Sequence, residues 1–134
     1  MTFDLSSLRV LFGALPVQAI VATQTSLEAD LAPEMTLCVV NLIPAEDSLI
    51  GFKGTPWHVH GSFIFCSRDG CYIEMTPEEV FGGLADGCIL ICERWFNKRL
   101  QDRWLAHRDY LGDFRYMEQG EEIRVKRFQS VPPA

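Results

Sequence analysis

The stretch VHGSFIFCSRDGCYIEM, residues 59–75, is the clearest indication of the fold class. Its two apolar, β-rich runs, Val59–Cys66 and Cys71–Met75, are joined by the four residues SRDG. Polar turn residues that end in glycine between two such runs predict a β-hairpin, with Gly70 at a position of positive φ. We therefore expect the sheet of this chain to be built largely from antiparallel, hairpin-linked strands.

The residues directly after this hairpin predict a helix. Thr76 is a typical N-cap residue, Pro77 suits the first helical position, and Glu79 lies three residues after the cap. The expected helix runs to about Ala85 and ends at Gly87, because glycine readily adopts the left-handed conformation that terminates helices.

Further elements are expected on both sides of this unit. A helix is predicted over residues 3–15, where apolar side chains recur every three or four residues before Pro16. Strands are predicted over residues 17–23, 35–43, 48–52 (a short edge strand), 88–92, 114–117 and 122–128, and a short helical turn over residues 26–31.

Residues 94–111 allow two interpretations. We favour a helix closed by Gly112, because Phe96, Leu100 and Trp104 follow helical spacing. The alternative is a tight turn at Asn97-Lys98 followed by a returning strand over residues 99–105.

Together these elements predict an α+β fold. Residues 1–128 are expected to form a single globular domain, mainly an antiparallel sheet of hairpin-linked strands with about three packed helices. Residues 129–134 contain two prolines and are expected to be a loose C-terminal tail.

Composition and charge narrow the functional classes. The 134 residues carry a net charge of −6, with 3 basic and 11 acidic side chains in residues 1–92 and 9 basic and 7 acidic ones in residues 93–134. This balance argues against a general nucleic-acid binder, which needs a basic face.

No apolar run approaches the length of about 18 residues that a membrane-spanning helix requires. Since the first residues also lack the features of a secretion signal, we expect a cytoplasmic protein without membrane contact.

The five cysteines are expected to be reduced thiols. Their number is odd and most lie in apolar runs, where free cysteine behaves as a small buried hydrophobe. Cys66 and Cys71 flank the hairpin turn, where they would face each other. A nucleophilic thiol would need a nearby histidine or helix N-terminus to lower its pKa. The spacing of the cysteines along the chain does not require such a neighbour.

The segment Trp57-His58-Val59-His60 is the candidate ligand pocket. Side chains at alternate strand positions project from one face, so His58 and His60 are candidate ligands for zinc or iron. The pair is similar to the His-x-His motif of the cupin family. The resemblance ends there, because residues 62–65 lack the expected glutamate and His107 has no second motif around it. A catalytic metal site would need a third protein ligand.

The charged run at residues 93–104 is the candidate partner surface. Arginine beside tryptophan is typical of protein–protein hot spots, so five residues of this run are candidates for contact with a partner. They are Arg94, Trp95, Arg99, Arg103 and Trp104. The alternative is a structural helix whose tryptophans are core residues and whose arginines pair with Glu93, Asp102 and Asp109. Stacking on nucleic-acid bases is a third and less favoured use of the segment.

These observations favour a non-catalytic function, since we find no complete catalytic set. We expect a small acidic protein that binds a protein partner or a second copy of itself, and an inhibitor or immunity-type protein is one concrete version. No cofactor is expected under this hypothesis. The alternative is a metal-dependent enzyme or a small-ligand-binding domain with its pocket at Trp57, His58 and His60.

Overall fold

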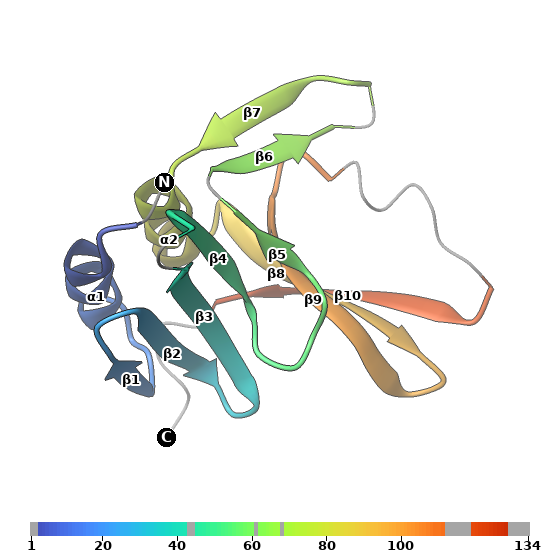
Figure 1. The fold of residues 1–134 in the computed structure, drawn as a ribbon. Coiled ribbons are helices and arrows are strands. Elements are labelled where there is room, and N and C mark those ends of the chain that lie inside the picture. Colours follow the sequence, from blue (N-terminus) through green and yellow to red (C-terminus); the bar gives the residue numbers. More distant parts are fainter. Residues whose placement is uncertain (1–2, 43–44, 61, 68, 112–118, 129–134) are drawn as a thin grey trace.

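The computed structural model describes residues 3–42, 45–60, 62–67, 69–111 and 119–128. This part of the chain has two helices and three antiparallel sheets, which is a mainly antiparallel α+β fold (Figure 1). The elements are α1 (Leu5–Gly13), β1 (Ala19–Ala22), β2 (Ser26–Ala32), β3 (Met35–Leu42), β4 (Asp47–Phe52), β5 (His58–Val59), β6 (Phe63–Cys66), β7 (Tyr72–Met75), α2 (Pro77–Asp86), β8 (Ile89–Phe96), β9 (Arg99–His107) and β10 (Glu121–Arg127).

The first sheet is a meander in which β1 to β5 pair in chain order. The helical turn expected over residues 26–31 is wrong, because these residues form most of β2. Leu27, Ala29 and Leu31 are buried and alternate with half-buried residues, which is the period-two pattern of a strand. The edge position expected for residues 48–52 is also wrong, since β5 pairs with β4 at Ile50 and Gly51.

The second sheet has the order β10-β8-β9. Our preferred helix over residues 94–111 is wrong, and the alternative strand is confirmed, so the described chain has two helices rather than about three. Phe96 pairs with Arg99 across the two-residue turn Asn97-Lys98, whose φ angles are 49° and 62°. Positive φ at both central residues is the type I′ geometry that suits the twist of a tight hairpin.

The expected hairpin and helix at the centre of the chain are confirmed. β6 and β7 form a two-stranded ribbon, and Gly70 has a φ of 90° in its turn. The expected first strand of this hairpin is shorter than residues 59–66, because Val59 belongs to β5. Helix α2 begins with a capping box between Thr76 and Glu79 and ends at Gly87, whose φ is 85°.

One hydrophobic core joins these parts. It extends in sequence from Phe3 to Phe128 and includes the inward face of the first sheet, the buried sides of both helices and one side of the β6–β7 ribbon. Helices α1 and α2 contact each other through Phe12 and Phe81, whose ring centroids are 4.7 Å apart. A smaller cluster of Cys92, Trp104 and Ala106 lies in the second sheet.

The described helices are short. Within the described ranges, no helix is long and apolar enough to cross a membrane. The strand expected over residues 114–117 and the tail expected over residues 129–134 lie outside the described residues.

Candidate functional site

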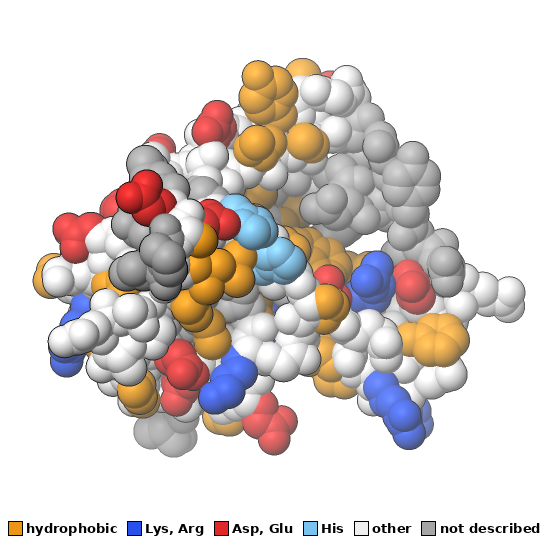
Figure 2. All heavy atoms as spheres, viewed as in Figure 1, with side chains coloured by type: hydrophobic (Ala, Val, Ile, Leu, Met, Phe, Trp, Pro, Cys, Tyr) orange, Lys and Arg blue, Asp and Glu red, His pale blue; other side chains and the backbone are white. Residues whose placement is uncertain are grey.

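His58 and His60 lie next to each other on the surface. His58 begins the short strand β5 and His60 directly follows it, so Val59 points away between them. Their ring centroids are 5.1 Å apart with an interplanar angle of 62°. Figure 2 shows histidine side chains together on this face, beside an acidic side chain. The structure thus brings together the two histidines that the sequence singled out.

Each of these rings has a partner for its Nδ1 atom. The Nδ1 atom of His60 lies 2.8 Å from Oδ2 of Asp47, at the start of the neighbouring strand β4, and that of His58 lies 3.0 Å from the carbonyl oxygen of Pro56. The hydrogen bond from His60 lowers the pKa of the Asp47 carboxyl, so Asp47 is ionised at neutral pH. Sequence reasoning missed Asp47, because the approach of β4 and β5 is set by pairing and not by spacing along the chain.

The third ligand that a catalytic metal site needs is not among the described residues. In ranges 3–42, 45–60, 62–67, 69–111 and 119–128, no three His, Cys, Asp or Glu side chains form a group that would hold a metal. The remaining histidine, His107, packs against Phe65 and Tyr110 instead, at centroid distances of 6.2 and 5.2 Å.

Trp57 links the two sheets. Its backbone N–H donates to Oδ1 of Asp102 on β9 at 3.0 Å, and its ring packs against both hydrophobic clusters. Phe52 and Phe63 lie 6.1 and 6.2 Å from it, centroid to centroid. A half-buried ring in this position is a packing contact between sheets, which limits its use as the wall of a ligand pocket.

The five residues of the candidate partner surface do not share one environment. Arg99 is exposed, and Arg94 and Trp95 are half-buried. Arg103 and Trp104 are buried, so they do not belong to an exposed surface. The reason is that β9 is covered on both faces at this point: Arg103 faces Glu93, while Trp104 belongs to the smaller hydrophobic cluster.

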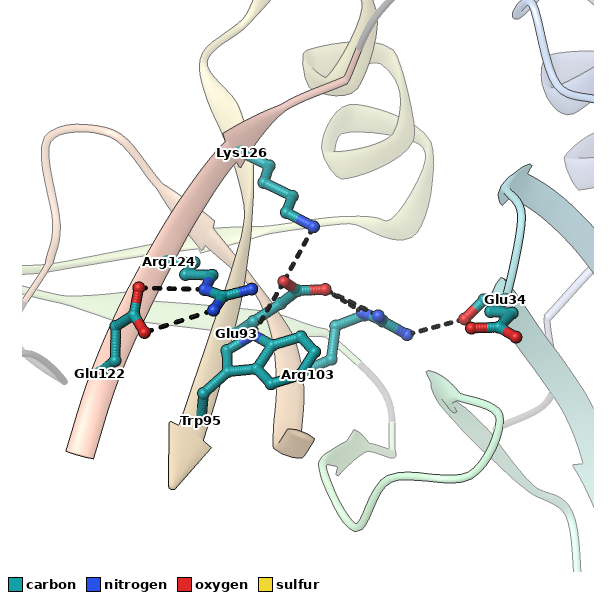
Figure 3. A network of polar contacts seen from close by, with 7 residues as sticks. All are labelled: Glu34, Glu93, Trp95, Arg103, Glu122, Arg124 and Lys126. Atoms are coloured by element: carbon teal, nitrogen blue, oxygen red, sulfur yellow. Dashed lines mark hydrogen bonds and ion pairs between the residues drawn. The ribbon is translucent and has the colours of Figure 1, made fainter. Parts of the chain in front are cut away.

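Glu93 is the centre of a buried polar network (Figure 3). Its Oε2 atom accepts two hydrogen bonds from Arg103, at 2.9 and 2.7 Å, and its Oε1 atom accepts from Trp95 at 3.1 Å and lies 3.0 Å from Nζ of Lys126. Arg103 also donates to the carbonyl oxygen of Glu34 at 3.1 Å, which connects the second sheet to the first.

The electrostatics of Glu93 are those of a structural ion pair. Burial raises the pKa of its carboxyl, but the hydrogen bonds from Lys126, Arg103 and Trp95 outweigh that effect and hold the pKa below its usual value. A carboxylate that is fully enclosed by donors has no free lone pair directed at solvent. We therefore assign this network to holding the sheets together.

Trp95 is covered on one side by a cation. The guanidinium carbon of Arg124 lies 4.3 Å from the centroid of the indole ring, and Glu122 binds the same guanidinium through two hydrogen bonds of 3.0 and 3.3 Å. Such stacking stabilises the surface of the second sheet. Arg124 thereby covers a face of Trp95, one of the residues that the sequence suggested for a partner surface.

The outer face of the β6–β7 ribbon carries exposed apolar side chains. Ile64 is 61% exposed and Tyr72 is 68% exposed, while their neighbours Phe63, Phe65 and Met75 on the inner face are buried. Figure 2 shows hydrophobic side chains gathered over this end of the molecule, where β6 and β7 lie in Figure 1. Sequence reasoning missed this face, because Phe63–Cys66 is apolar throughout and gives no sign of which side is outward.

The five cysteines are free thiols in unequal environments. Cys66 and Cys71 are exposed, whereas only Cys92 is fully buried, so the expectation of buried thiols is wrong for these two. Cys66 lies opposite Tyr72 in the ribbon rather than opposite Cys71. Burial raises the pKa of the Cys38 and Cys88 thiols, which keeps them protonated and poorly nucleophilic.

Comparisons with protein-family models, curated proteins and solved structures found no match to this chain.

Proposed function

We propose that this chain is a non-catalytic domain that binds a basic protein partner through the outer face of the β6–β7 ribbon. The observation that carries the proposal is the exposure of Ile64 and Tyr72, at 61% and 68%, on a ribbon whose other side is anchored in the core. An inhibitor or immunity-type protein, which masks the working surface of its target, fits this arrangement.

The ribbon offers two sources of binding energy. Complete burial of a side chain such as Ile64 stabilises an interface by about 1.5–3 kcal/mol, and tyrosine is enriched among hot-spot residues. Within the described part of the chain, β6 and β7 pair only with each other. Among the described residues no further strand pairs with the edges of the ribbon, and a sheet edge of this kind accepts the addition of a partner's strand.

The charge around the ribbon favours a basic partner. Asp69 and Glu74 are exposed on the ribbon, and Glu78 and Glu79 are exposed in the first turn of α2. Across residues 62–86 the sequence has five acidic side chains and one arginine. Complementary charge raises the rate of association and suppresses wrong partners, so a basic target surface is favoured.

The alternative of an enzyme or small-ligand pocket has less support. Trp57 is engaged in packing between the sheets, and the histidine pair has no third protein ligand in the described ranges.

A cytoplasmic location remains part of the proposal. The free thiols of Cys66 and Cys71 support a reducing compartment, because exposed cysteines are readily oxidised elsewhere.

Affinity capture from a lysate of the source organism tests the proposal with a matched pair of variants. Ile64→Ser/Tyr72→Ser removes the ribbon's apolar face, and Val10→Ser/Val21→Ser removes exposed valines from α1 and β1. We expect the wild type and the valine variant to retain the same basic protein, with less retained at high salt, and the ribbon variant to lose it.

Two results would overturn the proposal. The first is retention of the same protein by the ribbon variant, and the second is the absence of any protein whose retention distinguishes the two variants. Sedimentation velocity on the purified chain supplies the control for self-association. If the wild type is a dimer and the Ile64→Ser/Tyr72→Ser variant is a monomer, the partner of the ribbon is a second copy of the chain rather than a basic protein.

A further inference from the structure

The histidine pair has a feature that the protein-binding proposal does not use. His58 and His60 are exposed, and the Nδ1 atom of each lies within hydrogen-bond distance of an acceptor oxygen, in the carbonyl of Pro56 for His58 and in the carboxylate of Asp47 for His60. Each ring must then carry its hydrogen on Nδ1 when it is neutral. The lone pair is therefore on Nε2 in both rings.

This arrangement is the one that metal-binding histidines adopt. A ligating imidazole almost always donates its other N–H to a carboxylate or a backbone carbonyl, which fixes the tautomer and the orientation of the ring. Here the carboxylate of Asp47 at 2.8 Å and the carbonyl of Pro56 at 3.0 Å provide one partner of each kind.

The separation of the rings also fits a shared ion. With a metal–nitrogen distance of about 2.0–2.1 Å, a further ~1.1 Å to the ring centre and a tetrahedral angle, two ligating imidazoles have centroids about 5.2 Å apart. The centroids of His58 and His60 are 5.1 Å apart.

We propose that His58 and His60 form a surface site for a divalent first-row transition ion of the zinc, nickel or copper class, bound through both Nε2 atoms. Asp47 and Pro56 act as positioning groups behind the ligands. Two protein ligands leave the other positions of the ion to water or to donors from a bound partner. Imidazole pairs select this class of ion, whereas calcium and magnesium require oxygen ligands.

Calorimetric titration of the purified chain with Ni²⁺ near neutral pH tests the site. Nickel is chosen because it suits imidazole, while thiolates favour zinc and monovalent copper. We expect one ion per chain. His58→Ala or His60→Ala should abolish the binding, and Asp47→Ala should weaken it by about tenfold, which is typical when a group behind a ligand is removed.

Matched controls separate this site from other donors. His107→Gln, which alters the remaining histidine, and Cys66→Ser/Cys71→Ser, which removes the exposed thiols, should leave the Ni²⁺ affinity unchanged. Since His58, His60 and Asp47 contribute side chains at the surface, circular dichroism should show the same fold in every variant.

A second measurement isolates the role of Asp47 as a positioning residue. Long-range ¹H–¹⁵N correlation spectra of the imidazoles should show the Nδ1–H tautomer for His58 and His60 without metal, and Asp47→Ala should remove that preference at His60 alone. Unchanged Ni²⁺ affinity in the His58→Ala and His60→Ala variants, loss of binding in the cysteine variant, or an Nε2–H tautomer in the wild type would each overturn the proposal.

Discussion

Replacing Arg103 by methionine tests how the two sheets are held together. The side chain of Glu93 is 0% exposed and that of Arg103 is 8% exposed, and Arg103 supplies both hydrogen bonds to Oε2 of Glu93. Arg103→Met leaves that oxygen buried without its donors and removes the link to the carbonyl oxygen of Glu34. Loss of one partner of a buried pair costs about 3–5 kcal/mol.

We expect the lower end of this range, about 3 kcal/mol, because Lys126 still lies 3.0 Å from the other carboxylate oxygen. The assay is urea unfolding followed by tryptophan fluorescence and circular dichroism. Since domains of this size have unfolding free energies of about 5–15 kcal/mol, the shift should be large. Arg99→Met is the matched control, because Arg99 is exposed on the same strand, and it should change stability by less than about 0.5 kcal/mol.

The double variant Glu93→Leu/Arg103→Met separates burial of charge from loss of contact. It should be more stable than Arg103→Met alone, since no unpaired carboxylate remains in the interior. A loss of less than about 1 kcal/mol in Arg103→Met, the value of a surface pair, would show that the buried pair does not hold the sheets together. So would a double variant that is no more stable than the single one.

Three further predictions concern stability. The folded state holds the pKa of Glu93 below its ordinary value of 4.5. The stability that this group contributes is therefore complete above pH 4.5 and is lost as the pH falls through the lower folded pKa. The free energy of unfolding of Glu93→Gln should accordingly depend less on pH in that acid range than that of the wild type. Thr76→Ala should cost about 1 kcal/mol in thermal or urea unfolding, since it removes the capping box with Glu79, and an unchanged midpoint would contradict the cap's role. Lys98→Gly should stabilise the chain by about 0.5 kcal/mol in the same assay, because φ at this position is 62°, and destabilisation would show that the turn is not strained.

The elements that could be predicted from the sequence are those with local signals. The hairpin around Gly70 and the helix from Pro77 to Asp86 have turn and cap residues at fixed spacing, and both are confirmed. The strand over residues 99–107 was less predictable, because Phe96, Leu100 and Trp104 also have helical spacing. Which interpretation holds depends on pairing with β8, a contact that spacing within one segment does not encode.

For the site residues, too, what could be predicted depends on whether the signal is local or comes from contacts between strands. The side-by-side placement of His58 and His60 follows from their alternate positions, whereas the contact with Asp47 depends on how β4 approaches β5. The burial of Arg103 depends on Glu93 in the paired strand. Exposure of Ile64 and Tyr72 depends on which side of the ribbon faces the core, and apolar runs do not specify that side.

Photo-crosslinking from the ribbon reports whether its outer face touches a protein partner. Tyr72 is replaced by p-benzoylphenylalanine, with the same replacement at Val21 as the matched control, since both positions are exposed but lie on different sheets. We expect a covalent adduct with one basic protein from position 72 and no such adduct from position 21. An adduct with that protein from position 21 alone, or no adduct from position 72, would contradict this expectation.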